Sequence, residues 1–216
     1  MIAFFDLDRT LLEVNSGGLW VKSEYREGYI NRWQLGRALF DLVRYHLGIA
    51  NLEMTLRRAI EFHKGVSGQS LRLRTERFYE SEVAGRYRPG ALVAVEHHRA
   101  RGDQLVLLTT SSKYLGDCVK LAVGLDGVLA TDFELDGEGC LTGVPIEPLC
   151  FGPGKLVAAS RYADEMNVSL SECTFYTDSF ADRSVMEAVG HPVAVHPDPR
   201  LARLARRHGW PIVSWD

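Results

Sequence analysis

The sequence predicts an α/β protein in which a parallel sheet carries helices on both faces and an all-helical segment is inserted. Short runs of apolar residues alternate with helix-length stretches over most of the chain, which is typical of a parallel sheet covered on both faces. One long section, residues 13–85, has the 3.6-residue apolar spacing of helices and no convincing strand. The 216 residues, 46% hydrophobic and 25% charged, suffice for one core and a small inserted domain.

The first strand is predicted at Ile2–Phe5, four apolar residues directly before the long helical section. Helical spacing within that section is clearest in the set Leu35, Leu39, Leu42, Val43 and Leu47. Gly48 and Asn51 indicate that one helix ends there and another begins. The section is therefore predicted to hold several helices.

The helical section is predicted to be an insertion, because the first strand belongs with strands that come much later in the chain. Residues 1–12 and 86–216 are expected to form the core, and residues 13–85 the inserted domain. The aromatic residues of the insertion are expected mostly inside its own core. They are Trp20, Tyr25, Tyr29, Trp33, Phe40 and Tyr45.

From residue 89 onward, helices and strands alternate. Helices are predicted at Ala91–Arg101, after Ser112, at Lys155–Asn167, at Asp182–Val189 and from Pro199. Strands are predicted at Leu105–Leu108, Val128–Ala130, Cys173–Thr177, Val193–Val195 and Ile212–Val213. Asp136-Gly137 lies between two short runs and is typical of a hairpin turn. His97, His98 and His208 lie in arginine-rich helical stretches and are expected in solvent.

Charge and composition exclude several classes of function. The formal net charge of −3 argues against nucleic acid as a partner. No apolar run approaches a membrane span, and residues 1–6 lack the basic start and long apolar stretch of a signal peptide. The cysteines show no C-x-x-C spacing, so we expect reduced thiols in a cytoplasmic protein. They are Cys118, Cys140, Cys150 and Cys173.

Polar residues that could carry chemistry follow several of the predicted strands. In an open parallel sheet, ligands bind beyond the carboxyl ends of the strands. Four acids lie at such positions: Asp6, Asp8, Asp178 and Asp182. Thr109 follows another strand, and the loop Gly152-Pro153-Gly154 leads into Lys155 at a helix start. We expect these side chains at one edge of the sheet.

Such a set of groups is suited to phosphoryl transfer. Carboxylates that face one another repel, and a divalent cation removes that cost. Oxygen ligands in small number suit Mg²⁺, which keeps several of its waters. A carboxylate nucleophile can form an aspartyl-phosphate. Asp8 can protonate the leaving oxygen and later activate water.

Four motifs resemble those of the haloacid dehalogenase superfamily of phosphatases. Asp6-Leu7-Asp8-Arg9-Thr10 is similar to its D-x-D-x-T motif, Thr109 to its second motif and Lys155 to its third. Residues 177–182 resemble the fourth, with Thr177 in place of the common glycine. The insertion is similar to the cap of the phosphoserine-phosphatase-like branch, subfamily IB. So are Cys150-Phe151-x-x-Gly154-Lys155 and the ending His208-Gly209-Trp210-Pro211.

The resemblance implies a Rossmann-like core and a role for each motif residue. Asp6 would be the nucleophile and Asp8 the general acid and base. Mg²⁺ would be held by Asp6, the carbonyl of Asp8 and Asp178, with Asp182 nearby. The residues that would bind the phosphoryl oxygens are Thr109, Thr110 and Lys155. Lys155 would also restrain Asp6.

The resemblance leaves the substrate open. Phosphoserine phosphatases have a glutamate nine residues after the nucleophile that binds the substrate ammonium group, and Asn15 stands there. Their carboxylate-binding arginine falls near Ala59, one residue from Arg58. Asn15 and Arg58 are thus the candidate substrate contacts, and phosphoserine is less favoured. Histidinol phosphate, other amino-alcohol phosphates and small sugar phosphates are candidates as well.

Three other functions would share part of this set of residues. A phosphotransferase would use the same intermediate. A phospho-accepting receiver module would lack an acid two residues after the nucleophile and would need no cap, whereas Asp8 and the insertion are present. A non-catalytic protein would not need the intact set Asp6, Asp8, Lys155 and Asp178. The insertion is also a candidate surface for a homodimer.

Overall fold

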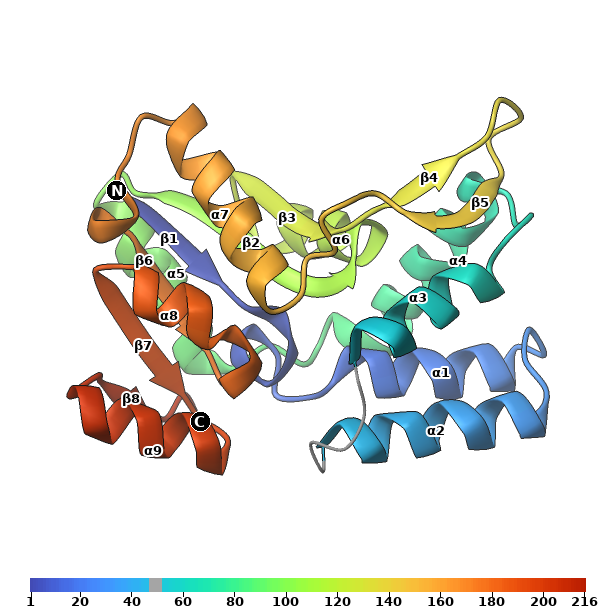
Figure 1. Ribbon diagram of the computed structural model, residues 1–216, viewed down its shortest axis with the longest axis horizontal. Coiled ribbons are helices and arrows are strands. Elements are labelled where there is room, and N and C mark those ends of the chain that lie inside the picture. The colour runs from blue at the N-terminus through green and yellow to red at the C-terminus, as the bar shows by residue number, and fades with distance from the viewer. Residues whose placement is uncertain (47–51) are drawn as a thin grey trace.

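The computed structural model describes residues 1–46 and 52–216 (Figure 1). A six-stranded sheet forms its centre, with the strand order β3-β2-β1-β6-β7-β8, and every pairing in it is parallel. The strands are β1 (Ile2–Phe5), β2 (Gln104–Ser112), β3 (Gly127–Thr131), β6 (Thr174–Thr177), β7 (His191–Val195) and β8 (Ile212–Val213). The predicted α/β fold class is confirmed. The predicted helix break at Gly48 and Asn51 lies outside the described residues.

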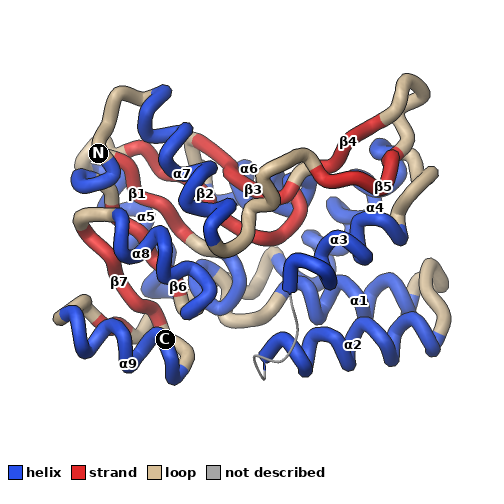
Figure 2. Tube along the Cα trace, in the orientation of Figure 1, coloured by secondary structure: helices blue, strands red, loops and turns tan. Residues whose placement is uncertain are grey.

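Helices cover both faces of the sheet (Figure 2). Side chains alternate along β1, so that Ala3 and Phe5 face one layer of helices while Ile2 and Phe4 face the other. The first layer holds α5 (Pro89–Ala100) and α6 (Lys113–Val123). The second holds α7 (Pro153–Glu165), α8 (Arg183–Ala188) and α9 (Pro199–His208). Because all four residues of β1 are fully buried, this strand anchors the core.

The helical segment between β1 and β2 lies beside the sheet, at one end of the molecule (Figure 1). It consists of α1 (Ser16–Arg26), α2 (Arg32–His46), α3 (Leu52–Phe62) and α4 (Gly68–Phe78). Its two connections to the sheet run side by side: the Glu13 amide donates to the Arg86 carbonyl (2.9 Å) and the Arg88 amide to the Leu11 carbonyl (2.9 Å). These two hydrogen bonds hold the ends of the segment together where it leaves and rejoins the rest of the chain.

The hairpin predicted at Asp136-Gly137 is present, formed by β4 (Phe133–Leu135) and β5 (Leu141–Pro145). It associates with the helical segment. The Gly65 amide donates to the Leu141 carbonyl (2.8 Å), and the Leu141 amide donates to the Val66 carbonyl (2.9 Å). A division of the chain at residue 86 assigns this hairpin to the core, whereas these hydrogen bonds attach it to the insertion.

Strand β2 is longer than predicted. The apolar run ends at Leu108, but backbone pairing continues to Ser112, which pairs with Thr131 beyond an irregularity in the register. The strand was predicted to end at Leu108 because polar residues follow it. An apolar run indicates which residues are buried, whereas strand pairing needs only backbone groups. The additional residues carry hydroxyl groups to the end of the sheet.

Two expectations about burial are wrong. Trp33 and Phe40 on α2 are 83% and 61% exposed, and Tyr25 and Tyr29 are also exposed, whereas Trp20 packs edge-on against Phe78. The side chain of Tyr45 lies outside those described. Large aromatic side chains are usually well buried, but these four are exposed to solvent in the described part of the chain.

The second wrong expectation concerns His98, which is 4% exposed instead of solvated. Its ring nitrogens contact the Asp103 carboxylate (2.8 Å) and the Tyr176 hydroxyl (2.9 Å). His97 and His208 are exposed, as predicted. The sequence around His98 carries no sign of its burial, because its partners come from a loop and from β6.

Within residues 1–46 and 52–216, no helix is both long and apolar enough to cross a bilayer. All four cysteines are free thiols, and Cys150 and Cys173 are buried.

Candidate active site

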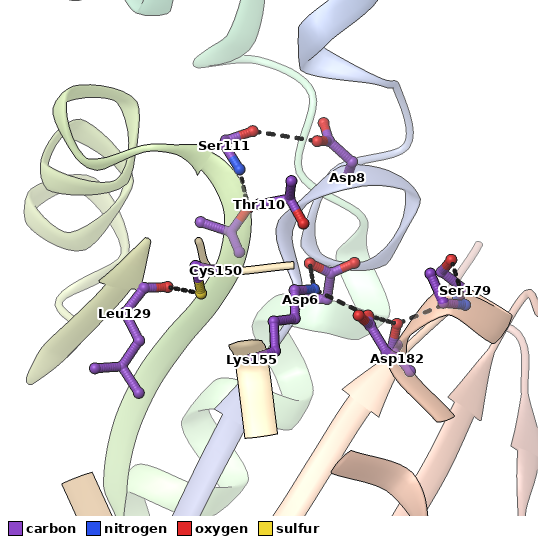
Figure 3. A network of polar contacts seen from close by, with 12 residues as sticks. Asp6, Asp8, Thr110, Ser111, Leu129, Cys150, Lys155, Ser179 and Asp182 are labelled. Carbon is purple, nitrogen blue, oxygen red and sulfur yellow. Dashed lines mark hydrogen bonds and ion pairs between the residues drawn. The ribbon is translucent and has the colours of Figure 1, made fainter. Parts of the chain in front are cut away.

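The carboxyl ends of three neighbouring strands, β2, β1 and β6, bring the predicted motif residues together (Figure 3). Asp6 follows β1 directly, and its amide donates to the Tyr176 carbonyl of β6 (2.9 Å). Thr109 lies on β2, and Asp178 follows β6. Because parallel strands end at the same edge, residues more than a hundred positions apart meet there.

Lys155 lies at the centre of this site and is 2% exposed. Its Nζ donates to Asp6 Oδ1 (2.9 Å) and to Asp182 Oδ2 (2.9 Å) (Figure 3). Burial opposes its charge, but the carboxylates of Asp182 and Asp6 outweigh burial and raise the pKa of Lys155 above its usual range. Lys155 is therefore a permanent cation that bridges the end of β1 and the loop after β6.

The position of Lys155 depends on a close approach of backbone at the start of α7. Gly152, with φ of 51°, precedes the helix, and Pro153 occupies its first turn. A Cβ atom on Gly154 would lie 1.8 Å from the Leu149 carbonyl oxygen. Glycine at residue 154 thus lets the helix begin where the third residue of α7 reaches the carboxylates.

The carboxylates of Asp6 and Asp178 resist ionisation. Burial and the repulsion of Asp182 and Asp8 raise the pKa of Asp6 to about 7, against the attraction of Lys155. Burial and the charges of Asp6 and Asp182 raise the pKa of Asp178 to about 8. Both carboxyl groups would ionise more readily beside an added cation.

The donor set fits a small hard cation that keeps part of its water. Among the described residues, no three His, Cys, Asp or Glu side chains gather closely enough to hold a metal by themselves. Asp182 is already engaged, since its Oδ2 also accepts a hydrogen bond from Thr177 (2.7 Å). The remaining donors are the carboxylates of Asp6 and Asp178 and the backbone carbonyl of Asp8. Two carboxylates, a carbonyl and water are oxygen ligands of the kind that Mg²⁺ takes.

Asp8 is held by two residues that the sequence did not single out. Its Oδ1 accepts a hydrogen bond from the Ser16 amide (2.5 Å). Its Oδ2 accepts one from the Ser111 hydroxyl (3.3 Å), which Figure 3 shows. Burial raises the pKa of Asp8 despite these hydrogen bonds. One signal could have found Ser111: it lies two residues after Thr109, the spacing of side chains on one face of a strand.

The two predicted phosphate-binding threonines lie next to this group. Thr109 is almost fully buried, and its hydroxyl accepts a hydrogen bond from the Ser111 amide (3.1 Å). The Thr110 carbonyl accepts one from the Thr131 hydroxyl (3.0 Å). Thr109 and Thr110 therefore belong to a hydrogen-bonded end of β2 whose amides and hydroxyls lie near Asp6.

The two predicted substrate contacts belong to different helices of the segment. Asn15 caps α1, and its Oδ1 accepts a hydrogen bond from the Gly18 amide (2.9 Å). Arg58 is exposed on α3 and forms no ion pair with a described residue, whereas Arg57 pairs with Glu147 (2.7 Å). The structure thus places Asn15 next to the Asp8 contacts, and no contact within the described chain joins Arg58 to the carboxylates.

A surface cavity of about 460 Å³ lies elsewhere. Its lining includes Thr174 and His191, which pair at the amino ends of β6 and β7. It is therefore on the opposite edge of the sheet from Asp6. The arrangement of charged groups, and not the size of a cavity, defines the candidate active site.

Comparison with known proteins agrees with this geometry. The family model described as haloacid dehalogenase-like hydrolase matches residues 3–187. The chain belongs to this family. It is a phosphoric monoester hydrolase of the phosphoserine-phosphatase-like kind, as the motifs predicted.

Relatives of this hydrolase match nearly its whole length. Phosphoserine phosphatase SerB1 of Mycobacterium tuberculosis is 31% identical over 97% of this chain and 69% of its own. Histidinol-phosphatase of Neisseria meningitidis serogroup C is 23% identical over 99% of this chain and 98% of its own. A crystal structure of a protein of unknown function from Bordetella pertussis Tohama I, 28% identical, superposes with a TM-score of 0.90 over 100% of this chain and 98% of that one.

Proposed function

We propose that this hydrolase is a Mg²⁺-dependent phosphatase that cleaves a small-molecule phosphomonoester through an aspartyl-phosphate on Asp6. The observation that carries the proposal is the pairing of two different aspartates two residues apart. Asp6 is held by the buried cation of Lys155, while Asp8 is held separately by neutral donors. One is thereby suited to attack and the other to proton transfer.

The reaction would take place in two displacements at phosphorus. A carboxylate oxygen of Asp6 attacks, the ester P–O bond breaks, and Asp8 donates its proton to the leaving alkoxide oxygen. Asp8 then takes a proton from water, the water oxygen attacks phosphorus, and the bond to Asp6 breaks to release inorganic phosphate. Asp6 and Asp8 end as they began, so no further reactant is needed.

The other groups would bind and orient the phosphoryl group. Lys155, charged and buried between Asp6 and Asp182, opposes the rise that burial causes in the pKa of the nucleophile and attracts phosphoryl oxygens. Thr109 and Thr110 would offer hydroxyl and amide donors to the same oxygens. Mg²⁺, held by Asp6, Asp178 and the Asp8 carbonyl, would neutralise charge between the nucleophile and the phosphoryl group.

The helical segment is proposed to act as the cap over this site and to select the substrate. Its first helix begins at Ser16, in contact with Asp8, so a substrate bound at Asp6 extends toward this segment. The two relatives act on amino-bearing phosphate esters by their names, and Asn15 caps the helix that begins beside Asp8. We therefore propose an amino-alcohol phosphate such as histidinol phosphate or phosphoserine, with Asn15 and Arg58 as candidate contacts.

A phosphomonoester panel with and without Mg²⁺ tests the proposal. The panel comprises histidinol phosphate, phosphoserine, phosphoethanolamine, glycerol phosphate and several sugar phosphates, with phosphate release as the readout. We expect one ester to exceed the others, EDTA to abolish release, and Asp6→Asn to lower turnover by about 10³-fold or more. Full turnover by Asp6→Asn in a folded protein would contradict the proposed nucleophile.

A further inference from the structure

We propose that Ser111 and Ser16 are positioning residues that hold the carboxyl group of Asp8 for proton transfer. The inference rests on the proposed function, because it assigns a task to residues around the proposed acid. The two serines come from different parts of the fold, Ser111 from β2 and Ser16 from the first turn of α1. The group that donates the proton is therefore tied both to the sheet and to the helical segment.

The contacts around Asp8 form a closed ring of three residues. One carboxyl oxygen accepts from the Ser16 amide (2.5 Å) and the other from the Ser111 hydroxyl (3.3 Å). The two serine hydroxyls lie 3.2 Å apart. Each carboxyl oxygen thus has its own donor, and the Ser16 hydroxyl lies within hydrogen-bonding distance of the hydroxyl that serves as the second donor.

This ring restricts rotation of the Asp8 side chain. An aspartate has two rotatable side-chain bonds, and a single hydrogen bond would leave the carboxyl group free to turn about the bonded oxygen. Donors on both oxygens fix the plane of the group. Because a misplacement of about 1 Å can cost about 100-fold in rate, loss of either donor should weaken proton donation without removing the proton itself.

The structure offers a matched pair of variants at Ser16. The residue occupies the first position of α1, where proline is well tolerated, and Asn15 before it has the extended backbone that precedes proline readily (φ −97°, ψ 110°). Ser16→Pro removes the amide donor, whereas Ser16→Ala keeps the amide and removes only the hydroxyl. At residue 111, Ser111→Ala removes the hydroxyl and Ser111→Thr keeps it.

A series of substituted phenyl phosphates provides the readout. p-Nitrophenolate leaves without a proton, whereas phenolate and p-methoxyphenolate leave more readily when the acid donates one. The readout is kcat/KM, which covers the steps up to departure of the leaving group. Ser111→Ala and Ser16→Pro should each lower kcat/KM about 10-fold more with phenyl phosphate than with p-nitrophenyl phosphate. A plot of log kcat/KM against the pKa of the leaving phenol gives a slope for each variant. The slope of Asp8→Asn shows the complete loss of proton donation, and Ser111→Thr should restore the slope of the wild type.

Ser112→Ala is the control, since the Ser112 hydroxyl caps α6 through the Leu115 amide and belongs to the same strand end. It should leave the leaving-group slope unchanged. The inference is overturned if folded Ser111→Ala and Ser16→Pro lower kcat/KM by the same factor on all esters, or do not lower it at all. That result would leave the proposed function standing, whereas activity that survives Asp6→Asn on every ester would remove the proposed function itself.

Discussion

The buried contact among Lys155, Asp6 and Asp182 shows how one side chain serves both stability and chemistry. The ammonium group satisfies two carboxylates at 2.9 Å each, and all three residues are at most 7% exposed. A buried ion pair adds little over an apolar replacement, but removal of one partner leaves an uncompensated charge. Lys155 is therefore expected to be indispensable to the fold as well as to phosphate binding.

A single and a double variant separate the role of Lys155 in stability from its role in phosphate binding. Lys155→Met should lower the free energy of unfolding by about 3–5 kcal/mol, because Asp6 and Asp182 would face each other without a cation. Adding Asp182→Asn should recover part of that stability but none of the phosphatase activity. Urea denaturation and phosphate release measure the two quantities. Equal stability of the single and double variants would mean that Asp182 does not repel Asp6 in the absence of Lys155.

The pair formed by His98 and Asp103 gives a pH-dependent prediction away from the active site. Burial alone would raise the pKa of Asp103, but the hydrogen bond and charge of His98, with Arg101 and the terminal amine, hold it below its ordinary value of 3.8. A lowered pKa in the folded state means that the unfolded chain binds the proton first. The stabilisation by the Asp103 carboxylate is therefore complete at pH values above 3.8, the ordinary pKa of this group. It is lost as the pH falls through the lower pKa that Asp103 has in the folded protein.

Asp103→Asn should remove this pH-dependent stabilisation. We expect the variant to be about 1–3 kcal/mol less stable than the wild type above about pH 5, because His98 loses a charged partner. The difference should narrow below about pH 4. Urea denaturation at pH 7, 5 and 3 measures it. A difference that is the same at all three values would show that the charge of Asp103 does not contribute.

At the scale of elements, the start of α7 determines where the lysine lies. Gly154→Ala would place a methyl group against the Leu149 carbonyl, so the helix must shift and carry Lys155 with it. We expect a loss of stability of about 1–3 kcal/mol together with a fall in activity. Gly137→Ala in the hairpin turn is a matched control, since nothing lies within 4 Å of its added methyl. If Gly137→Ala lost as much stability and activity as Gly154→Ala, the close contact of residue 154 with the Leu149 carbonyl would not be the cause of the loss.

At the scale of the whole molecule, Asp6 and Asp178 bring charge from opposite parts of the chain into one buried site. Their raised pKa values of about 7 and about 8 record the cost of that arrangement when no cation is present. In metal-free protein at pH 8, Asp178→Asn should therefore raise the melting temperature, since a neutral amide replaces a repelled carboxylate. With Mg²⁺ present, the wild type should become the more stable of the two.

Thermal melts of both proteins in EDTA and in Mg²⁺ measure this reversal. Asp136→Asn in the exposed hairpin, which keeps a side-chain oxygen for the turn, is the control, and it should respond to Mg²⁺ as the wild type does. If Asp178→Asn gained as much from Mg²⁺ as the wild type, Asp178 would not be a ligand of the cation.

Much of the fold followed from local patterns. The short apolar runs predicted five later strands because buried parallel strands need apolar side chains on both faces. The helical spacing of residues 13–85 predicted the insertion for the same kind of reason, since burial of one helix face imposes a period. The predicted end of β2 was wrong because the strand extends past Leu108 with polar side chains, and Ser112 pairs with Thr131 beyond an irregularity in the register.

The order of residues along the chain is enough to show which side chains can do chemistry, because acids and a hydroxyl lie at the ends of strands of one parallel sheet and a lysine begins a helix beside them. How these side chains are used depends on contacts that form only in the folded protein. The tertiary structure joined Ser16 and Ser111 to Asp8, buried His98 and attached the hairpin to the helical segment. Local periodicity reports backbone state and burial, whereas these contacts join residues up to 103 positions apart, and no local pattern encodes such a partner.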